Sequence, residues 1–126
     1  MYEPNKEKKP VLKQIYDVLK QDGFEVYFPS QKNGECLKEY VVVKFVGSAS
    51  ELSVSSERPI YEFMVYVPTN RYSIFEQYIF DIKQTLKQLY PLISYAGNET
   101  SSYYDETVKG HMISFQYQGI RKINNW

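Results

Sequence analysis

The sequence predicts an α+β fold in which an antiparallel-dominated sheet of about four strands carries two helices packed on one face. Segments 11–19 and 75–89 place apolar residues at three- and four-residue steps, as amphipathic helices do. Strand-like alternation or β-branched and aromatic enrichment marks four segments: 24–28, 39–46, 60–67 and 107–120. Because a helix with one apolar stripe must bury it against another layer, we expect two layers around one core.

The first helix is expected to follow a short charged arm. Residues 1–9 are rich in Lys, Glu and Pro and lack apolar periodicity, so we expect a mobile N-terminal arm. Pro10 suits a first helical turn, and Gly23 can supply the left-handed stop after Asp22. The apolar stripe between them consists of Val11, Leu12, Ile15, Val18 and Leu19.

Two strands should come next. Phe24 to Phe28 alternates and is closed by Pro29, which favours a short edge strand. Segment 30–38 is polar and contains the turn dipeptide Asn33-Gly34. Glu39 to Val46 includes three consecutive valines, which predicts a strand covered on both faces in the middle of the sheet.

A third strand runs directly into the second helix. In Ile60 to Val67, the side chains of Tyr61, Phe63, Val65 and Val67 share one parity and should face the core. Pro68 should end the pairing, and Thr69-Asn70 should cap a helix. Pro91 limits that helix to about twenty residues, roughly 30 Å. Its apolar stripe is Phe75, Tyr78, Ile79, Ile82, Leu86 and Leu89, with Lys83 and Lys87 on the wet side.

Two polar stretches should be exposed excursions. Gly47 to Arg58 contains five Ser and should be a long hairpin loop. Leu92 to Asp105, with Gly97-Asn98 and Tyr103-Tyr104, should be a second one. Thr107 to Ile120 alternates and should be the last strand. We therefore expect one domain over residues 10–120 and a C-terminal tail at 121–126.

Composition narrows the class of protein. Fifteen basic and fifteen acidic residues give zero formal charge, so nothing attracts the chain to nucleic acid or anionic lipid. Cys36 is alone, and the sequence has neither a signal peptide nor an apolar run long enough for a membrane span, so we expect folding in a reducing cytoplasm. Thirteen Tyr exceed what a small core absorbs, and Tyr favours interfaces.

No catalytic, cofactor or metal site is expected. His111 suits a strand residue at the core edge, and Cys36 has no neighbour that would activate a thiolate. The acidic pairs Glu57/Glu62 and Asp105/Glu106 suit solvated side chains better than a divalent ion site. Base stacking on RNA would use Tyr61, Phe63, Phe115 and Tyr117, but these rings are needed for the core, and the chain has no basic excess.

The order of elements resembles that of the tail terminator or tail-completion (head-to-tail joining) proteins of long-tailed bacteriophages and phage-tail-like bacteriocins. The matching residues are Val11 to Leu19, the Val-Tyr-Phe-Pro of 26–29, the Glu-Tyr-Val-Val-Val of 39–43, the Ser-rich hairpin closing on Glu57-Arg58, Tyr61 to Val67, Ser73 to Tyr90, and His111 to Phe115. The resemblance implies a virion protein without enzymatic activity. Its members form rings, usually hexameric, that cap the tail tube and join it to the head connector.

The resemblance implies three partners: copies of the chain itself, a tail tube protein and a head-tail connector protein. Membrane and sequence-specific nucleic acid are not expected. Candidate contact residues lie in the hairpin, the second excursion and the tail: Ser48, Glu51, Leu52, Val54, Glu57, Arg58, Tyr103, Tyr104, Arg121 and Trp126. Two alternatives stay open, namely another head-tail joining or minor capsid protein of similar fold, and a monomeric domain that binds peptide or RNA.

Overall fold

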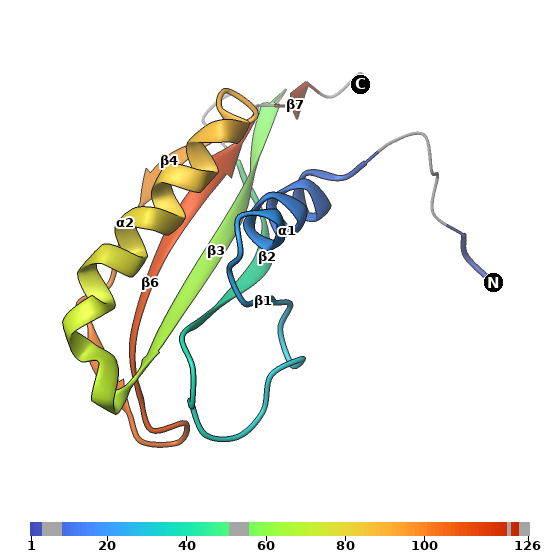
Figure 1. Cartoon of the computed structure of the whole chain (residues 1–126). Helices are drawn as coiled ribbons and strands as arrows, with labels where there is room; N and C mark the ends of the chain where they lie inside the picture. The colour runs from blue at the N-terminus through green and yellow to red at the C-terminus, as the bar shows by residue number, and fades with distance from the viewer. Residues whose placement is uncertain (4–8, 51–55, 121, 124–126) are drawn as a thin grey trace.

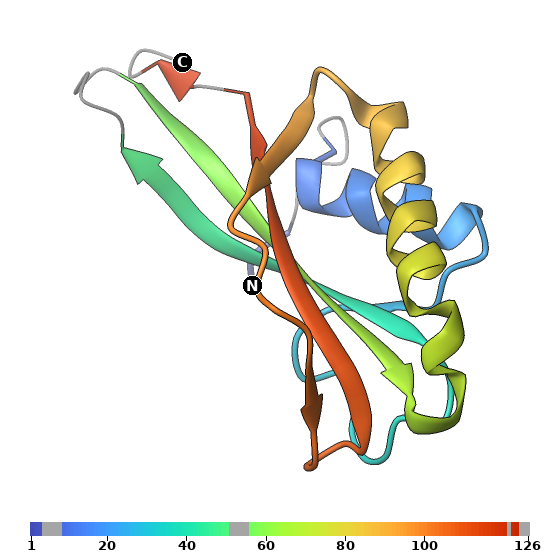
Figure 2. The same ribbon diagram turned by 90° about the vertical axis from the view of Figure 1, so that its left-hand side faces the viewer.

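The computed structural model describes residues 1–3, 9–50, 56–120 and 122–123, and it has the expected α+β architecture. Two α-helices, α1 (Val11–Gln21) and α2 (Phe75–Leu86), lie on the same face of a twisted sheet (Figures 1 and 2). Among the described residues, the sheet has seven strands rather than about four. They are β1 (Val26–Tyr27), β2 (Tyr40–Ser50), β3 (Ser56–Pro68), β4 (Ile93–Gly97), β5 (Tyr103–Asp105), β6 (Gly110–Gly119) and β7 (Lys122–Ile123).

The strand order across the sheet is β1-β2-β3-β6-β4, with β5 also paired to β6 and β7 to β3. All pairs are antiparallel except β1 with β2, where Val26 stands opposite Val41. A parallel pair needs a connection long enough to return the chain to its starting end. The polar segment 28–39, which we expected only to turn, supplies that return.

The three valines of segment 39–46 suggested a strand in the middle of the sheet, but this prediction is wrong. β3 is central, with β2 on one side and β6 on the other. β1 pairs only with Val41 and Val42, so the outer side of β2 is open beyond them among the described residues. Phe45 and Val46 are accordingly about half exposed. The valine run reflects burial at one end of a long strand, and that burial does not extend along its whole length.

Most of the Ser-rich segment 47–58, which we expected to be a loop, belongs to the paired strands β2 and β3. β2 and β3 stay paired from Tyr40 and Tyr66 out to Ser50 and Glu57, with one register shift between Phe45 and Gly47. Gly47 has a φ of 130°, which an L side chain rarely adopts, so glycine suits this irregularity. The two strands extend beyond the part of the sheet that the helices cover (Figure 2). The remaining part of the expected loop, residues 51–55, lies outside the described ranges.

The second excursion also contains strands. β4 and β5 both pair with β6, and between them the Thr100 amide donates to the Ser114 carbonyl oxygen at 2.9 Å. Segment 93–105 therefore follows the outer side of β6 instead of forming a free loop. The sequence did not reveal these strands, because an edge strand has one solvent-exposed face and can therefore contain many polar residues.

The core lies between the helices and one face of the sheet, and the expected helix stripes are correct. Ile15 and Leu19 of α1 and Phe75, Ile82 and Leu86 of α2 are buried, with Tyr78, Ile79 and Leu89 packed at its margin. On β3 the expected core face, Tyr61, Phe63, Val65 and Val67, is buried. Gly23, with a φ of 93°, follows α1 as expected.

The start of the second helix differs from the expectation. A 3-10 segment, Thr69–Ile74, precedes α2, and another, Lys87–Leu89, follows it, so the helical stretch has about the expected length. The Thr69 side chain does not cap this stretch. Its hydroxyl instead donates to the Lys109 carbonyl oxygen at 3.2 Å, which ties the helix start to the beginning of β6.

An ion pair joins this helix start to Glu39, the residue that precedes β2. Arg71 Nε is 2.8 Å from Glu39 Oε2, and Arg71 Nη2 is 3.2 Å from Oε1. Burial of Glu39 by itself raises its pKa, but the hydrogen bonds and charge of Arg71 outweigh it and leave the pKa below its usual value. A carboxyl with a lowered folded pKa contributes stability above its unfolded pKa, and that stability is lost as the pH falls through the folded pKa.

We therefore expect Arg71→Gln to lower the free energy of unfolding by up to about 1 kcal/mol at neutral pH, since the pair is partly exposed. The difference from the wild type should shrink from neutral to acid pH, as the pH falls through the folded pKa of the Glu39 carboxyl. Urea denaturation at both pH values measures it. Lys109→Gln is the matched control, because its ammonium is 3.9 Å from Glu35 Oε1 in a longer and more exposed ion pair. A deficit independent of pH would contradict the ion-pair account.

Candidate interaction surface

A row of four aromatic side chains crosses the sheet on the helix-bearing face. Phe45, Tyr61, Tyr117 and Tyr95 stand opposite one another on β2, β3, β6 and β4. The inner two are 5% exposed, whereas Phe45 is 51% and Tyr95 46% exposed. The ring centroids of Phe45 and Tyr61 are 5.6 Å apart, and those of Tyr95 and Tyr117 are 5.4 Å apart. The two middle rings of the row are therefore part of the core, and the ring at each end is half exposed at an edge of the sheet.

An apolar groove of about 640 Å³ lies beside Phe45. The beginning of α1 forms one wall, with Val11 and Leu12, and the base of the β2–β3 hairpin forms another. Pro59, Tyr61, Leu92 and Ile120 complete the apolar part of the lining. An exposed apolar groove of this kind is typical of a site that contacts another protein.

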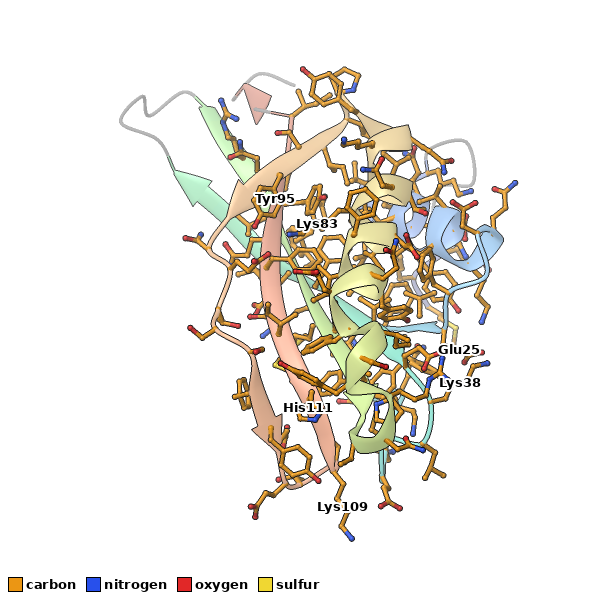
Figure 3. The ribbon with its side chains drawn as sticks, turned by 60° about the vertical axis from the view of Figure 1, so that its left-hand side comes forward. Glu25, Lys38, Lys83, Tyr95, Lys109 and His111 are labelled. Atoms are coloured by element: carbon orange, nitrogen blue, oxygen red, sulfur yellow. The ribbon has the colours of Figure 1, made fainter. Side chains whose placement is uncertain are left out.

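At the opposite edge, Tyr95 is held in place by charged neighbours. Lys83 Nζ is 4.7 Å from the centroid of the Tyr95 ring and 4.8 Å from that of Phe115. The same ammonium is 2.7 Å from Glu99 Oε1, which also accepts a hydrogen bond from the Tyr95 hydroxyl at 3.1 Å. Figure 3 shows Lys83 of α2 beside Tyr95 of β4. Desolvation and the hydrogen bond to Glu99 raise the pKa of Tyr95.

A second aromatic group surrounds His111 near the other end of β6. Its imidazole lies 4.5 Å from the Tyr72 ring and 5.3 Å from the Tyr104 ring, centroid to centroid. Half-buried on the strand, His111 occupies the core edge, where it was expected (Figure 3). The Tyr104 hydroxyl is 3.2 Å from Thr69 Oγ1, so this group also connects β5 to the helix start.

The sheet face without helices carries tyrosines as well. The Tyr40 and Tyr66 rings stack at 4.8 Å, and Tyr27 meets Tyr40 edge-on at 5.7 Å. Lys32 lies 5.4 Å from the Tyr40 ring centroid, which brings segment 28–39 against this face. Burial raises the pKa of both Tyr40 and Tyr66. Part of the tyrosine surplus therefore packs within the subunit.

The predicted contact residues fall into separate places. Ser48 and Arg58 lie on the β2–β3 hairpin, with Ser48 exposed and Arg58 half-buried. Glu57 pairs through its backbone with Ser50 and Lys122, and Tyr103 and Tyr104 are exposed on β5, at the opposite end of the sheet. The described candidate residues therefore belong to two separate surfaces, one on the β2–β3 hairpin and one on β5. The remaining candidates, Glu51, Leu52, Val54, Arg121 and Trp126, lie outside the described residues.

Several exposed apolar residues were missed by the sequence argument. Phe45 and Val46 were assigned to a covered strand, and Tyr95 to a loop. Tyr72 and Phe80, also about half exposed, line or border a second groove of about 580 Å³ between α2 and segment 99–102. Alternation could have placed Phe45 on the same face as Val41 and Val43, but only the register shows that it ends an aromatic row.

The residues weighed for chemistry are placed as follows. Cys36 is buried, and burial raises the pKa of its thiol. Within the described ranges no group of three or more His, Cys, Asp and Glu side chains could hold a metal ion. Tyr61, Phe63, Phe115 and Tyr117 are buried under the helices, where no base could stack on them. In the described part of the chain, no helix combines the length and apolarity that a membrane crossing requires.

Comparison with known proteins adds little to this geometry. No protein-family model matches the sequence, and no curated protein matches it. One solved chain, which carries no functional name, is similar over 83% of this chain and 86% of its own length, with 13% sequence identity and a TM-score of 0.48.

Proposed function

We propose that the protein is a structural ring subunit of a long-tailed bacteriophage or phage-tail-like particle, a tail terminator that caps the tail tube and joins it to the head connector. The proposal starts from the resemblance in the order of elements. The observation that carries it further is the aromatic row, whose two ends are exposed on opposite edges of one sheet. A subunit in a cyclic ring needs two different contact patches, one for each neighbour.

Other features of the surface fit an assembly protein. The described residues include exposed Tyr72, Tyr90, Tyr95, Tyr103 and Tyr104, and Tyr supplies a large contact area at low entropic cost. Zero formal charge means that contacts with further copies meet no net repulsion. The four buried core rings weigh against the alternative of a base-stacking RNA-binding domain. Another head-tail joining protein of similar fold would share all these features.

Light scattering coupled to size-exclusion chromatography tests the ring. We expect a concentration-dependent rise from the monomer mass to one closed multiple, visible as rings by negative-stain microscopy. Each interface should bury roughly 800 Å² per partner, as stable interfaces do. A protein that stays monomeric at every concentration, and is found as single copies in purified particles, would contradict the proposal. Labelling the protein in such particles then locates it at the head end of the tail.

A further inference from the structure

The sheet has an unpaired edge on each side. β1 covers β2 only at Val41 and Val42, so among the described residues the outer side of β2 is open from Val43 to Ser50. On the other side, β4 pairs with β6 through one of its edges only, and its outer edge is open in the described chain. Open strand edges present unpaired amides and carbonyls that can accept another strand.

The two open edges stand at the same level of the sheet. Across the ladders, Ser94 aligns with Gln118, Ile60 and Gly47, and Tyr95 aligns with Tyr117, Tyr61 and Phe45. Gly97 aligns with Gln116, Glu62 and Lys44. A head-to-tail contact closes into a ring only if it adds no rise from one subunit to the next. Edges at one level meet that condition.

The directions of β2 and β4 also allow these two edges to pair between subunits. The pairs β2–β3, β3–β6 and β6–β4 are all antiparallel, so β4 runs opposite to β2. If the next subunit is rotated about an axis along the strands, each strand keeps its direction. β4 of one subunit then meets β2 of the next as an antiparallel pair, which continues the pattern of the sheet.

The side chains at the two edges match. At the shared level, Phe45 and Tyr95 both lie on the helix-bearing face, so the junction would continue the aromatic row as a cross-strand pair. The apolar groove beside Phe45 offers room for the incoming ring. No like charges meet at this junction: Lys44 is the only charged residue in 40–50, and Ile93–Gly97 contains none.

We infer that the chain binds a second copy of itself by pairing the outer edge of β2 (Val43–Ser50) with the outer edge of β4 (Ile93–Gly97), with Phe45 opposite the neighbour's Tyr95. This contact rests on the proposed ring and specifies its interface. Repeated around the ring, it joins the sheets of all subunits into one closed sheet with the helices on one side.

Cysteine cross-linking of the full chain tests the pairing. In the variant Phe45→Cys with Tyr95→Cys, mild oxidation at high concentration should give a ladder of disulfide-linked species that stops at the number of subunits in the ring. The two cysteines cannot bridge within one subunit, because three strand spacings, about 14 Å, separate them, and a disulfide needs Cα atoms within about 7 Å. The wild type, whose Cys36 is 3% exposed, gives the background.

The matched control is Phe45→Cys with Tyr103→Cys. Tyr103 is 51% exposed on the same side of β6, but it stands at the level of Met112, near the other end of the sheet. This control should give no ladder. Circular dichroism should show that all variants keep the wild-type fold, since the three replaced side chains are all about half exposed.

Each other outcome has a distinct meaning. Rings seen by light scattering without a ladder in the 45/95 variant would overturn this interface and leave the ring proposal intact. A covalent dimer from Phe45→Cys alone would show two-fold β2–β2 pairing and would likewise overturn it. Monomers without any covalent species at the highest concentration would overturn this interface, and single copies in purified particles would in addition overturn the ring.

Discussion

Replacing Ile82 with alanine is expected to lower the free energy of unfolding by about 2–5 kcal/mol. Ile82 lies in the middle of α2, is 0% exposed, and packs in the core between the helix and the sheet. Truncation removes buried methyl groups from a site fixed by the sheet below, so the cavity can collapse only in part. Urea denaturation followed by circular dichroism measures the loss as a shift of the midpoint at constant slope.

Two lysines serve as comparisons: Lys83 on α2, and Lys87 at the start of the 3-10 segment that follows it. Lys87 is exposed, and Lys87→Ala should change the free energy of unfolding by less than about 0.5 kcal/mol. The sequence placed Lys83 with it on the wet face, but Lys83 contacts Glu99, Tyr95 and Phe115. Lys83→Ala should therefore cost about 1 kcal/mol. Equal midpoints for the Ile82 and Lys87 variants would mean that the helix buries a different face.

The helices and the central strand were predictable because their signals are local. An apolar stripe such as Phe75, Ile82 and Leu86 specifies which helix face is buried, whatever the neighbouring layer is. The alternation of Tyr61, Phe63 and Val65 does the same for β3. Proline and glycine at Pro68, Gly23 and Pro91 then mark the ends of elements through their backbone restrictions.

Strand order and edges were not predictable, because they depend on pairing between distant segments. The valines of β2 have the same appearance in a central strand and in a strand covered at one end only. β4 and β5 are only five and three residues long, so their pairing with β6 leaves little trace in the sequence. The candidate interface was missed for the same reason: Phe45 and Tyr95 are fifty residues apart, and only the register aligns them.

Shortening the β2–β3 hairpin is expected to abolish tail completion without unfolding the subunit. Ala49 already pairs with Arg58, so an Asn-Gly turn can replace residues 50–57 and join the two strands directly. The hairpin extends past the helices, and none of its described residues beyond Val43 and before Tyr61 belongs to the core (Figure 2). The free energy of unfolding should therefore fall by less than about 1 kcal/mol.

The reason to expect a loss of function is the cost of ordering such a projection, which a contact with the tail tube would offset. The deletion keeps Phe45 and Tyr95, so shortened subunits should still associate with one another in light scattering. In a host that produces the particles, however, they should give tails that do not join heads. A full-length control with Leu52→Ser and Val54→Ser separates the effect of hairpin length from that of these two apolar side chains. Tails of normal length joined to heads in the shortened variant would show that the hairpin makes no essential contact.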